Sequence, residues 1–328
     1  MAKLRLSLAC WDYDRTRALV DGRVAVDGVE LIYHALPVEE TFFRMLRYRE
    51  FDAAELSLSS YLLSTFRDDP FVAIPVYPSR YFRHSCIFVS GKSGIREPKD
   101  LIGKRVGVPE YQLTANVWIR GLLADEYGVP VEGVTYLTGG EETPGRIEKV
   151  ALQLPPSIRV EPIGPDQTLS AMLASGEIDA LYAPRKPSTY GTAGIRRLFE
   201  DYVPLEREYY QRTGIFPIMH VIAIRREVYE ANRWLATALF KAFKASQALA
   251  YDDLRVTAAL KTMLPWAVAE DERTRSLMGD DFWSYGFTPA NERVLEAFAR
   301  YHHEQGLSPR KREPRELFAP ETLEAFTI

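Results

Sequence analysis

The chain has 328 residues, of which 46% are hydrophobic and 26% charged, and its formal net charge is −4. This composition is typical of a soluble globular protein, and the length exceeds what one hydrophobic core usually holds, so we expect two domains. The sequence contains no basic run or tail, which argues against nucleic acid as a partner.

Alternating strands and helices are predicted over the first sixty residues. Strands are expected at Leu4–Ala9, Val29–Ala35 and Phe51–Leu56, with helices at Arg15–Val20 and Val38–Tyr48. This order is typical of a parallel sheet covered by helices. Because ligands bind at the carboxyl ends of strands in such sheets, the residues that follow the first and third strands are candidates for a site.

The pattern starts again after a glycine- and serine-rich linker at residues 90–94. The elements expected from there on are a strand at Arg105–Pro109, a helix at Thr114–Tyr127, a strand at Tyr136–Gly140, an irregular or hairpin-like stretch at Leu154–Pro165, a helix at Thr168–Ser175 and a strand at Ile178–Ala183. A further strand, Ile215–Ile224, leads back toward the first region, and helices dominate from Glu227 onward.

This order of elements predicts two α/β lobes, with the second inserted into the first. The first lobe is then discontinuous and consists of residues 1–90 and 217–328, and the second consists of residues 91–216. We expect a ligand cleft between the two lobes.

The cysteines and apolar runs bear on the compartment. Cys10 and Cys86 are too few for a disulfide framework or a structural zinc site. A leader peptide ending at Cys10 is an alternative interpretation of the first residues, but Arg5 interrupts an apolar stretch that is short for a signal core. No apolar run approaches the length of a membrane span. We therefore expect a reduced, cytoplasmic protein with no membrane partner.

The segment Pro78–Cys86 combines cationic, aromatic and imidazole side chains. In an extended segment alternate side chains share one side, and those side chains are here Arg80, Phe82, His84 and Cys86. A cation for a carboxylate, a ring for stacking and a proton carrier would suit an aromatic acid. The alternative is an edge strand with solvated arginines.

Four side chains are candidates for acid–base chemistry. His84 belongs to the segment just described, and His220 has apolar neighbours, so a packed structural histidine is the alternative for it. Glu55 lies in an apolar strand, where a carboxylate is costly unless it is paired or protonated. Asp12 is either a helix cap or a group that faces the ligand.

Further candidates for substrate binding lie near predicted strand ends and helix starts. Arg185 follows a strand, and the helix start near Thr114 offers free N–H groups for an anion. With these we group Arg80, Arg83, Trp11, Ser57, Ser59, Tyr111 and Phe216.

Cofactor motifs are missing from the sequence. It contains no dinucleotide glycine fingerprint, phosphate-binding loop, nucleophile elbow or paired-cysteine metal motif, so we expect no cofactor. A divalent metal held by Asp12, Glu55 and a histidine stays open, although no spacing demands it.

Several long blocks of the sequence are similar to the 4,5-dihydroxyphthalate decarboxylase family, and the similarity runs from end to end. These blocks are Trp11–Leu19, Glu39–Leu46, Pro78–Cys86, Gly103–Tyr111, Thr138–Glu142, Gly214–His220 and Gly279–Trp283. The family resembles two-lobed, type II periplasmic solute-binding proteins in fold, and Leu173–Ala180 resembles a motif common to that wider group.

The resemblance implies the loss of one ring carboxylate from 4,5-dihydroxyphthalate, which gives protocatechuate and carbon dioxide. Each carboxylate is para to a hydroxyl, and ionising that hydroxyl pushes electron density onto the carbon that must be protonated. No redox cofactor is needed for this step. We assign Arg80 and Arg185 to hold the carboxylates, because a guanidinium pairs with a carboxylate through two parallel hydrogen bonds.

For the proton transfers, His84 or His220 is expected to act as acid and base, and Asp12 or Glu55 to accept the hydroxyl protons. Two other functions remain alternatives. One is a non-catalytic solute-binding protein for an aromatic or small organic acid, and the other is a ligand-sensing module. We expect a small aromatic acid as substrate and a homo-oligomeric assembly.

Overall fold

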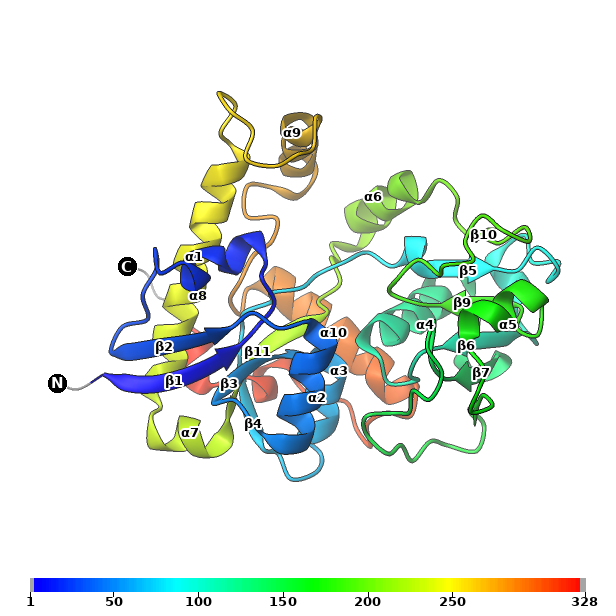
Figure 1. Cartoon of the computed structure of the whole chain (residues 1–328), viewed down its shortest axis with the longest axis horizontal. Helices are drawn as coiled ribbons and strands as arrows, with labels where there is room; N and C mark the ends of the chain where they lie inside the picture. Colours follow the sequence, from blue (N-terminus) through cyan, green and yellow to red (C-terminus); the bar gives the residue numbers. More distant parts are fainter. Residues whose placement is uncertain (1–2, 325–328) are drawn as a thin grey trace. The chain divides into compact units, whose positions relative to one another are not determined.

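The computed structural model describes residues 3–324 (Figure 1). The chain forms two compact units, each with its own sheet. Among the described residues, unit 1 comprises 3–80, 218–293 and 313–324, and unit 2 comprises Tyr81–Pro217 and Val294–Arg312. Residues 1–2 and 325–328, which the sequence assigns to the first lobe, lie outside the described residues.

These boundaries differ from those expected from the sequence. The chain enters unit 2 at Tyr81 and not at residue 91, because Ile87–Val89 forms a strand of the second sheet. A late segment, Val294–Arg312, also belongs to unit 2. Its Tyr301 ring packs on Trp118 and on Gly121, where a Cβ atom would lie 2.3 Å from that ring.

Unit 1 is built on a five-stranded mixed sheet of order β2-β1-β3-β11-β4. Strands β1, β2 and β3 are parallel to one another, and β11 is antiparallel to both β3 and β4. The bounds are β1 Leu4–Ala9, β2 Val29–His34, β3 Ala53–Ser57, β4 Phe71–Ile74 and β11 His220–Arg225.

In unit 1, α2 packs against β3, and α8 packs against α1 and the 3₁₀ helix η1. The helices that lie in unit 1 are α1 Arg17–Val20, α2 Val38–Tyr48, α3 Leu58–Ser64, α7 Arg226–Ala231, α8 Trp234–Leu254 and α9 Ala267–Met278, with 3₁₀ helices η1 Asp14–Thr16, η5 Pro314–Leu317 and η6 Pro320–Thr322. Helix α10, Pro289–Glu304, begins in unit 1 and ends in unit 2.

Unit 2 has a six-stranded sheet of order β10-β5-β9-β6-β7-β8. Strands β9, β6, β7 and β8 are parallel, whereas β5 is antiparallel to β9 and β10. The elements are β5 Ile87–Val89, β6 Arg105–Val108, β7 Thr135–Thr138, β8 Arg159–Pro162, β9 Ala180–Tyr182, β10 Arg196–Arg197, α4 Thr114–Tyr127, α5 Leu169–Ser175 and α6 Tyr202–Thr213, with 3₁₀ helices η2 His84–Cys86, η3 Pro98–Leu101 and η4 Val131–Gly133.

The α/β class predicted from the sequence is confirmed, but two local predictions are wrong. Pro78–Cys86 is not a continuous strand: Arg80 makes one isolated bridge with Ile218, and His84–Cys86 forms a 3₁₀ helix. The side chains of this segment therefore do not alternate as in a strand. The proline-rich Leu154–Pro165 contains β8, which extends the second sheet by pairing with β7.

Helices capable of crossing a membrane were sought among residues 3–324, and none has the required length and hydrophobicity.

Candidate functional site

Glu55 lies at the centre of a hydrogen-bonded cluster in unit 1. The β1–β3 register pairs Ala9 with Ala54, so the next residue of each strand, Cys10 and Glu55, also lie side by side. The Cys10 thiol donates to Oε2 of Glu55 at 3.4 Å, and the backbone N–H of Trp11 donates to the same oxygen at 3.1 Å. The end of β1 therefore covers one carboxylate oxygen.

The other carboxylate oxygen of Glu55 is bound by a phenol and an imidazole. Tyr13 donates its hydroxyl to Oε1 at 2.7 Å, and Nδ1 of His220 lies 2.6 Å from the same atom. In the β3–β11 register Glu55 faces Ile222, so His220, two residues away, shares its face of the sheet. The edge of the Phe42 ring, on α2, packs on the imidazole with 4.8 Å between centroids.

The charge on Glu55 is set by two opposing effects. Complete burial would raise the pKa of Glu55, but the hydrogen bond and charge of His220, with the bonds from Tyr13 and Trp11, hold that pKa below its ordinary value. Glu55 is therefore ionised at neutral pH. Burial and the Glu55 charge raise the pKa of both Tyr13 and Cys10, so these groups stay protonated and donate.

This arrangement leaves one nitrogen of His220 available. With Nδ1 bonded to Glu55, the ring is fixed in orientation, and Nε2 has no partner among the residues that the structure describes. The His220 side chain is 15% exposed, so part of it borders solvent. A histidine held by a carboxylate, with its second nitrogen open, can donate and accept a proton at a bound ligand.

Three other predicted residues lie close to this cluster in the chain. Ser57 is opposite His220 in the β3–β11 register, and its hydroxyl accepts the N–H of Ser60 at the start of α3. Ser59 is fully buried, and Trp11 is partly exposed.

Asp12 is not part of the hydrogen-bonded cluster around Glu55. Its carboxylate accepts two hydrogen bonds of 3.2 Å from the exposed guanidinium of Arg17. It is also not a helix cap, because Tyr13 occupies the N-cap position of η1. The structure therefore gives Asp12 a surface ion pair and no contact with Glu55.

Arg80 is buried in unit 1 against neutral oxygen atoms. Its guanidinium donates to the backbone oxygen of Ser284 at 3.0 Å and to Oδ1 of Asn291, and it lies 5.0 Å from the Tyr77 ring centroid. Burial lowers the pKa of Arg80 to about 10. These contacts join the segment before unit 2 to α10 and favour a structural role over carboxylate binding.

His84 lies in an aromatic environment in unit 2. It is 2% exposed, and its ring packs edge-on against Phe199 and Tyr209. Nδ1 makes no hydrogen bond within residues 3–324, and the nearest acidic oxygen, of Glu206, is 3.9 Å away. Burial lowers the pKa of His84 to about 4 and raises the pKa of Glu206 to about 7. Both shifts favour uncharged forms.

The remaining predicted binding residues belong to unit 2. Arg83 is buried beside Tyr81 and Cys86, and Arg185 is exposed. The other three have these positions: Tyr111 is fully buried and bonds the backbone of Gln305, Thr114 is buried as the first residue of α4, and Phe216 stacks on Phe82.

Sequence reasoning missed Tyr13, Cys10 and Phe42, which contact the Glu55–His220 pair directly. A usable signal was present for two of them, because Cys10 and Tyr13 follow the strand whose carboxyl end was expected to face a ligand. Phe42 gives no such signal, since an aromatic residue on the inner face of a helix is ordinary core.

No group of three or more His, Cys, Asp or Glu side chains in the described part of the chain is placed to hold a metal ion. The structure does not bring together the metal ligands considered from the sequence, which were Asp12, Glu55 and a histidine. Asp12 instead pairs with Arg17.

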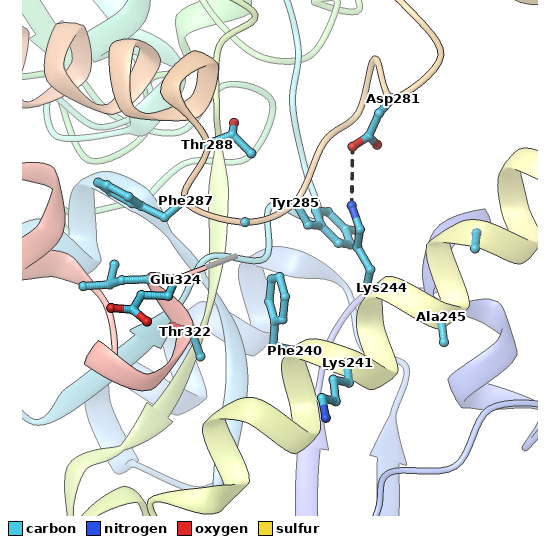
Figure 2. Close-up of a pocket in the computed structure, with 13 residues that line it drawn as sticks. Phe240, Lys241, Lys244, Ala245, Asp281, Tyr285, Phe287, Thr288, Thr322 and Glu324 are labelled. Atoms are coloured by element: carbon cyan, nitrogen blue, oxygen red, sulfur yellow. Dashed lines mark hydrogen bonds and ion pairs between the residues drawn. The ribbon is translucent and has the colours of Figure 1, made fainter. Parts of the chain in front are cut away.

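A cavity of about 650 Å³ lies elsewhere in unit 1 (Figure 2). It is lined by residues of α8, by Asp281 and residues 285–288, and by residues 322–324, and none of the predicted site residues lines it. Lys244 on α8 reaches Asp281 at 3.4 Å across one side (Figure 2). The segment that carries Asp281 also carries Trp283, whose N–H groups bond Tyr251 and Tyr77.

Comparisons with solved structures establish the fold. The chain matches the periplasmic aliphatic sulphonate binding protein SsuA from Escherichia coli with a TM-score of 0.55 and 15% identity, covering 97% of this chain and 98% of that one. It matches the alkanesulfonate-binding protein SsuA from Xanthomonas axonopodis pv. citri with a TM-score of 0.52 and 14% identity, over 97% and 98% of the two chains. The expected fold of periplasmic binding proteins is thereby confirmed.

Comparisons with curated sequences address the family. No protein-family model matches the chain. The 4,5-dihydroxyphthalate decarboxylase of Comamonas testosteroni is 46% identical over 331 residues, which span 100% of both sequences. A protein of the same name from Pseudomonas putida is 48% identical over 204 residues, covering 61% of this chain and 79% of that protein. The chain therefore belongs to the 4,5-dihydroxyphthalate decarboxylase family.

Proposed function

We propose that this protein is a carboxy-lyase that removes one carboxylate from 4,5-dihydroxyphthalate and releases protocatechuate and carbon dioxide. The names of two relatives at 46% and 48% identity support the substrate. The observation that carries the chemistry is the His220–Glu55 pair, with 2.6 Å between Nδ1 and Oε1 and with Nε2 open. Decarboxylation of an arene needs such a proton donor, because the departing carboxylate must be replaced by hydrogen.

The proposed reaction protonates the ring and then releases carbon dioxide. The hydroxyl para to the reacting carboxylate first loses its proton to solvent, which raises the electron density at the ring carbon that bears this carboxylate. The Nε2–H of protonated His220 then transfers its proton to that carbon. The C–C bond breaks, carbon dioxide leaves, and its bonding electrons restore the aromatic ring. The phenolate of the product and the imidazole of His220 each then take a proton from solvent, which completes the turnover.

Glu55 contributes by orientation and by charge. Its ionised carboxylate holds Nδ1 and thereby fixes the orientation of the imidazole. Because Tyr13 and Cys10 also donate to this carboxylate, it stays in one position while the imidazole gains and loses its proton. We assign the proton-carrier role to His220 and not to His84, whose surroundings favour the neutral ring.

A direct assay tests the proposal. Purified protein is incubated with 4,5-dihydroxyphthalate, and protocatechuate and carbon dioxide are quantified. We expect the two products in equal amounts. The alternative, a binding protein for an aromatic acid, rests on the fold shared with sulphonate-binding proteins. Saturable binding of 4,5-dihydroxyphthalate without product formation would favour that alternative and refute the decarboxylase.

We also propose that turnover needs no redox cofactor or metal, because the para oxygen accepts the electron density of the reaction. Dialysis against EDTA should then leave turnover unchanged. Loss of turnover that a divalent cation restores would contradict this part of the proposal.

A further inference from the structure

Arg15 places a cation beside the Glu55 cluster. Its Cζ lies 4.0 Å from the ring centroid of Tyr13, the residue whose hydroxyl bonds Glu55. The same phenol therefore contacts the guanidinium with its ring and the carboxylate with its hydroxyl. The Arg15 side chain is 15% exposed, so it is largely withdrawn from water yet accessible.

The guanidinium is held in position by several contacts. Nε donates to the backbone oxygen of Pro78 at 2.6 Å, and Cζ lies 4.2 Å from the ring centroid of Trp283. Trp283 is itself fixed, because its indole N–H donates to the backbone of Tyr77 and its backbone N–H donates to Tyr251. Arg15 is therefore oriented before any ligand binds, which lowers the entropic cost of using it.

Arg15 does not use all of its hydrogen-bond donors within the described residues. Nη1 donates to Asp14 at 2.9 Å, but Nη2, with two N–H groups, has no partner within residues 3–324. Asp14 is itself 62% exposed, and a pair with such an exposed carboxylate is weak and readily exchanged. A guanidinium in this state can accept a second carboxylate without losing a buried partner.

We propose that Arg15 binds the ring carboxylate that the substrate retains, through Nη2, while His220 acts on the neighbouring carboxylate. This assignment rests on the proposed function. The substrate is a dianion, and the ionised Glu55 would repel it unless a cation lay near by. Arg15 supplies that cation, and its contacts with Tyr13, Trp283 and Pro78 hold it in place for a charge-assisted hydrogen bond from Nη2. Arg80, the arginine assigned to this task from the sequence, is occupied by neutral oxygens of its own unit.

The alternative is that Arg15 serves only as a packing contact between aromatic rings. The two roles differ in what they predict for ligands. A carboxylate-binding residue should discriminate between phthalate, which has both carboxylates and no hydroxyl, and catechol, which has both hydroxyls and no carboxylate. A packing residue should affect the two ligands alike.

The test measures equilibrium binding of phthalate and of catechol to the full chain by calorimetry. For Arg15→Met we expect the Kd of phthalate to rise about 10- to 100-fold, because a charge-assisted pair is lost. The Kd of catechol should change less than about threefold, and Arg15→Lys should recover part of the phthalate affinity. Arg23→Met is the matched control, since Arg23 makes an exposed 2.9 Å pair with Asp21. Unchanged phthalate affinity in Arg15→Met, equal losses for both ligands, or no phthalate binding by the wild type would overturn the proposal.

A second variant does not disturb the buried contacts. Asp14→Asn removes the exposed competing carboxylate, and we expect it to tighten phthalate binding about two- to fivefold. Unchanged or weaker phthalate binding would contradict the proposal even if Arg15→Met failed to fold. Since neither experiment depends on turnover, failure of the decarboxylase assay leaves the Arg15 assignment testable. Selective loss of phthalate binding supports Arg15 whether or not product forms.

Discussion

Two histidines of this chain show how surroundings decide the role of one residue type. His220, in unit 1, is bonded through Nδ1 to an ionised carboxylate and keeps Nε2 open. His84, in unit 2, is enclosed by aromatic rings, and burial lowers its pKa to about 4. The first is bonded to a charged partner, whereas the second stays neutral and packs against aromatic rings.

The neighbouring carboxylates reinforce this difference. Glu55 is buried completely, yet the hydrogen bonds from His220, Tyr13 and Trp11 hold its pKa below the ordinary value, so this carboxylate stays ionised. Glu206, near His84, has a pKa raised to about 7 by burial, so it does not offer His84 a full negative charge. The two pairs thus differ both in the donors that bond the carboxylate and in its distance from the histidine, which is 2.6 Å for His220 and 3.9 Å for His84.

Replacing His220 should have the largest effect. In His220→Gln the side-chain amide can still donate to Glu55, but no group remains to protonate the ring. We expect kcat to fall about 100- to 10,000-fold, the range that general acid–base catalysis contributes. Phthalate binding should persist within about threefold, which calorimetry will check. Turnover within tenfold of the wild type would remove His220 from the mechanism.

Glu55→Gln should follow, with turnover reduced about 100-fold, because the imidazole loses the carboxylate that orients it. The amide nearly preserves the volume of the side chain, so the fold should survive, as circular dichroism can verify. The measurement is kcat at neutral pH. If Glu55→Gln turns over as fast as the wild type, the orientation of His220 does not depend on this carboxylate.

His84→Phe should weaken the pH dependence of the free energy of unfolding and leave turnover within a few-fold of the wild type. In the wild type the pKa of His84 is lower in the folded state than its ordinary unfolded value of about 6.5. The unfolded chain then binds more protons as the pH falls from about 6.5 toward 4, so stability declines over that window. We expect about 2 kcal/mol of this decline between pH 7 and pH 5, and its absence in the variant.

Urea unfolding of both proteins at pH 7 and pH 5 measures this difference. Equal pH dependence in the variant would show that His84 titrates normally. A large loss of turnover in a folded His84→Phe protein would instead restore the catalytic role predicted from the sequence, and the contrast between the two histidines would fail.

Much of the fold could be predicted from the sequence, because it rests on local patterns. Short apolar runs separated by amphipathic segments predicted β1, β2, β3 and α2 closely. The prediction for the proline-rich segment Leu154–Pro165 was wrong because strand pairing depends on residues distant in sequence. Strand β8 forms there by pairing with the edge of β7.

The candidate site was only partly predictable. A carboxylate inside an apolar strand singled out Glu55, since burial without partners would be costly. Its partners come from 165 residues away in His220 and from 42 residues away in Tyr13, so their contact depends on strand order, which no local pattern encodes. The same limit explains Arg80 and His84, whose local sequence resembles a ligand site and whose neighbours in the fold are neutral or aromatic. Their roles in binding and catalysis stay predictions.

Tyr13→Phe should give the smallest effect and the finest test of the comparison. The variant keeps the ring beside Arg15 and removes one of the donors that hold Glu55 ionised. A lost hydrogen bond of this kind costs about 1 kcal/mol, so we expect kcat to fall about 3- to 10-fold and stability to drop by a similar energy. Tyr33→Phe is the matched control, because the hydroxyl of Tyr33 donates to the backbone of Trp11 and not to Glu55.

Loss of stability in both variants with loss of kcat in Tyr13→Phe alone would show that donors to the carboxylate set the reactivity of His220. Equal kcat losses would mean that the donors act only through packing.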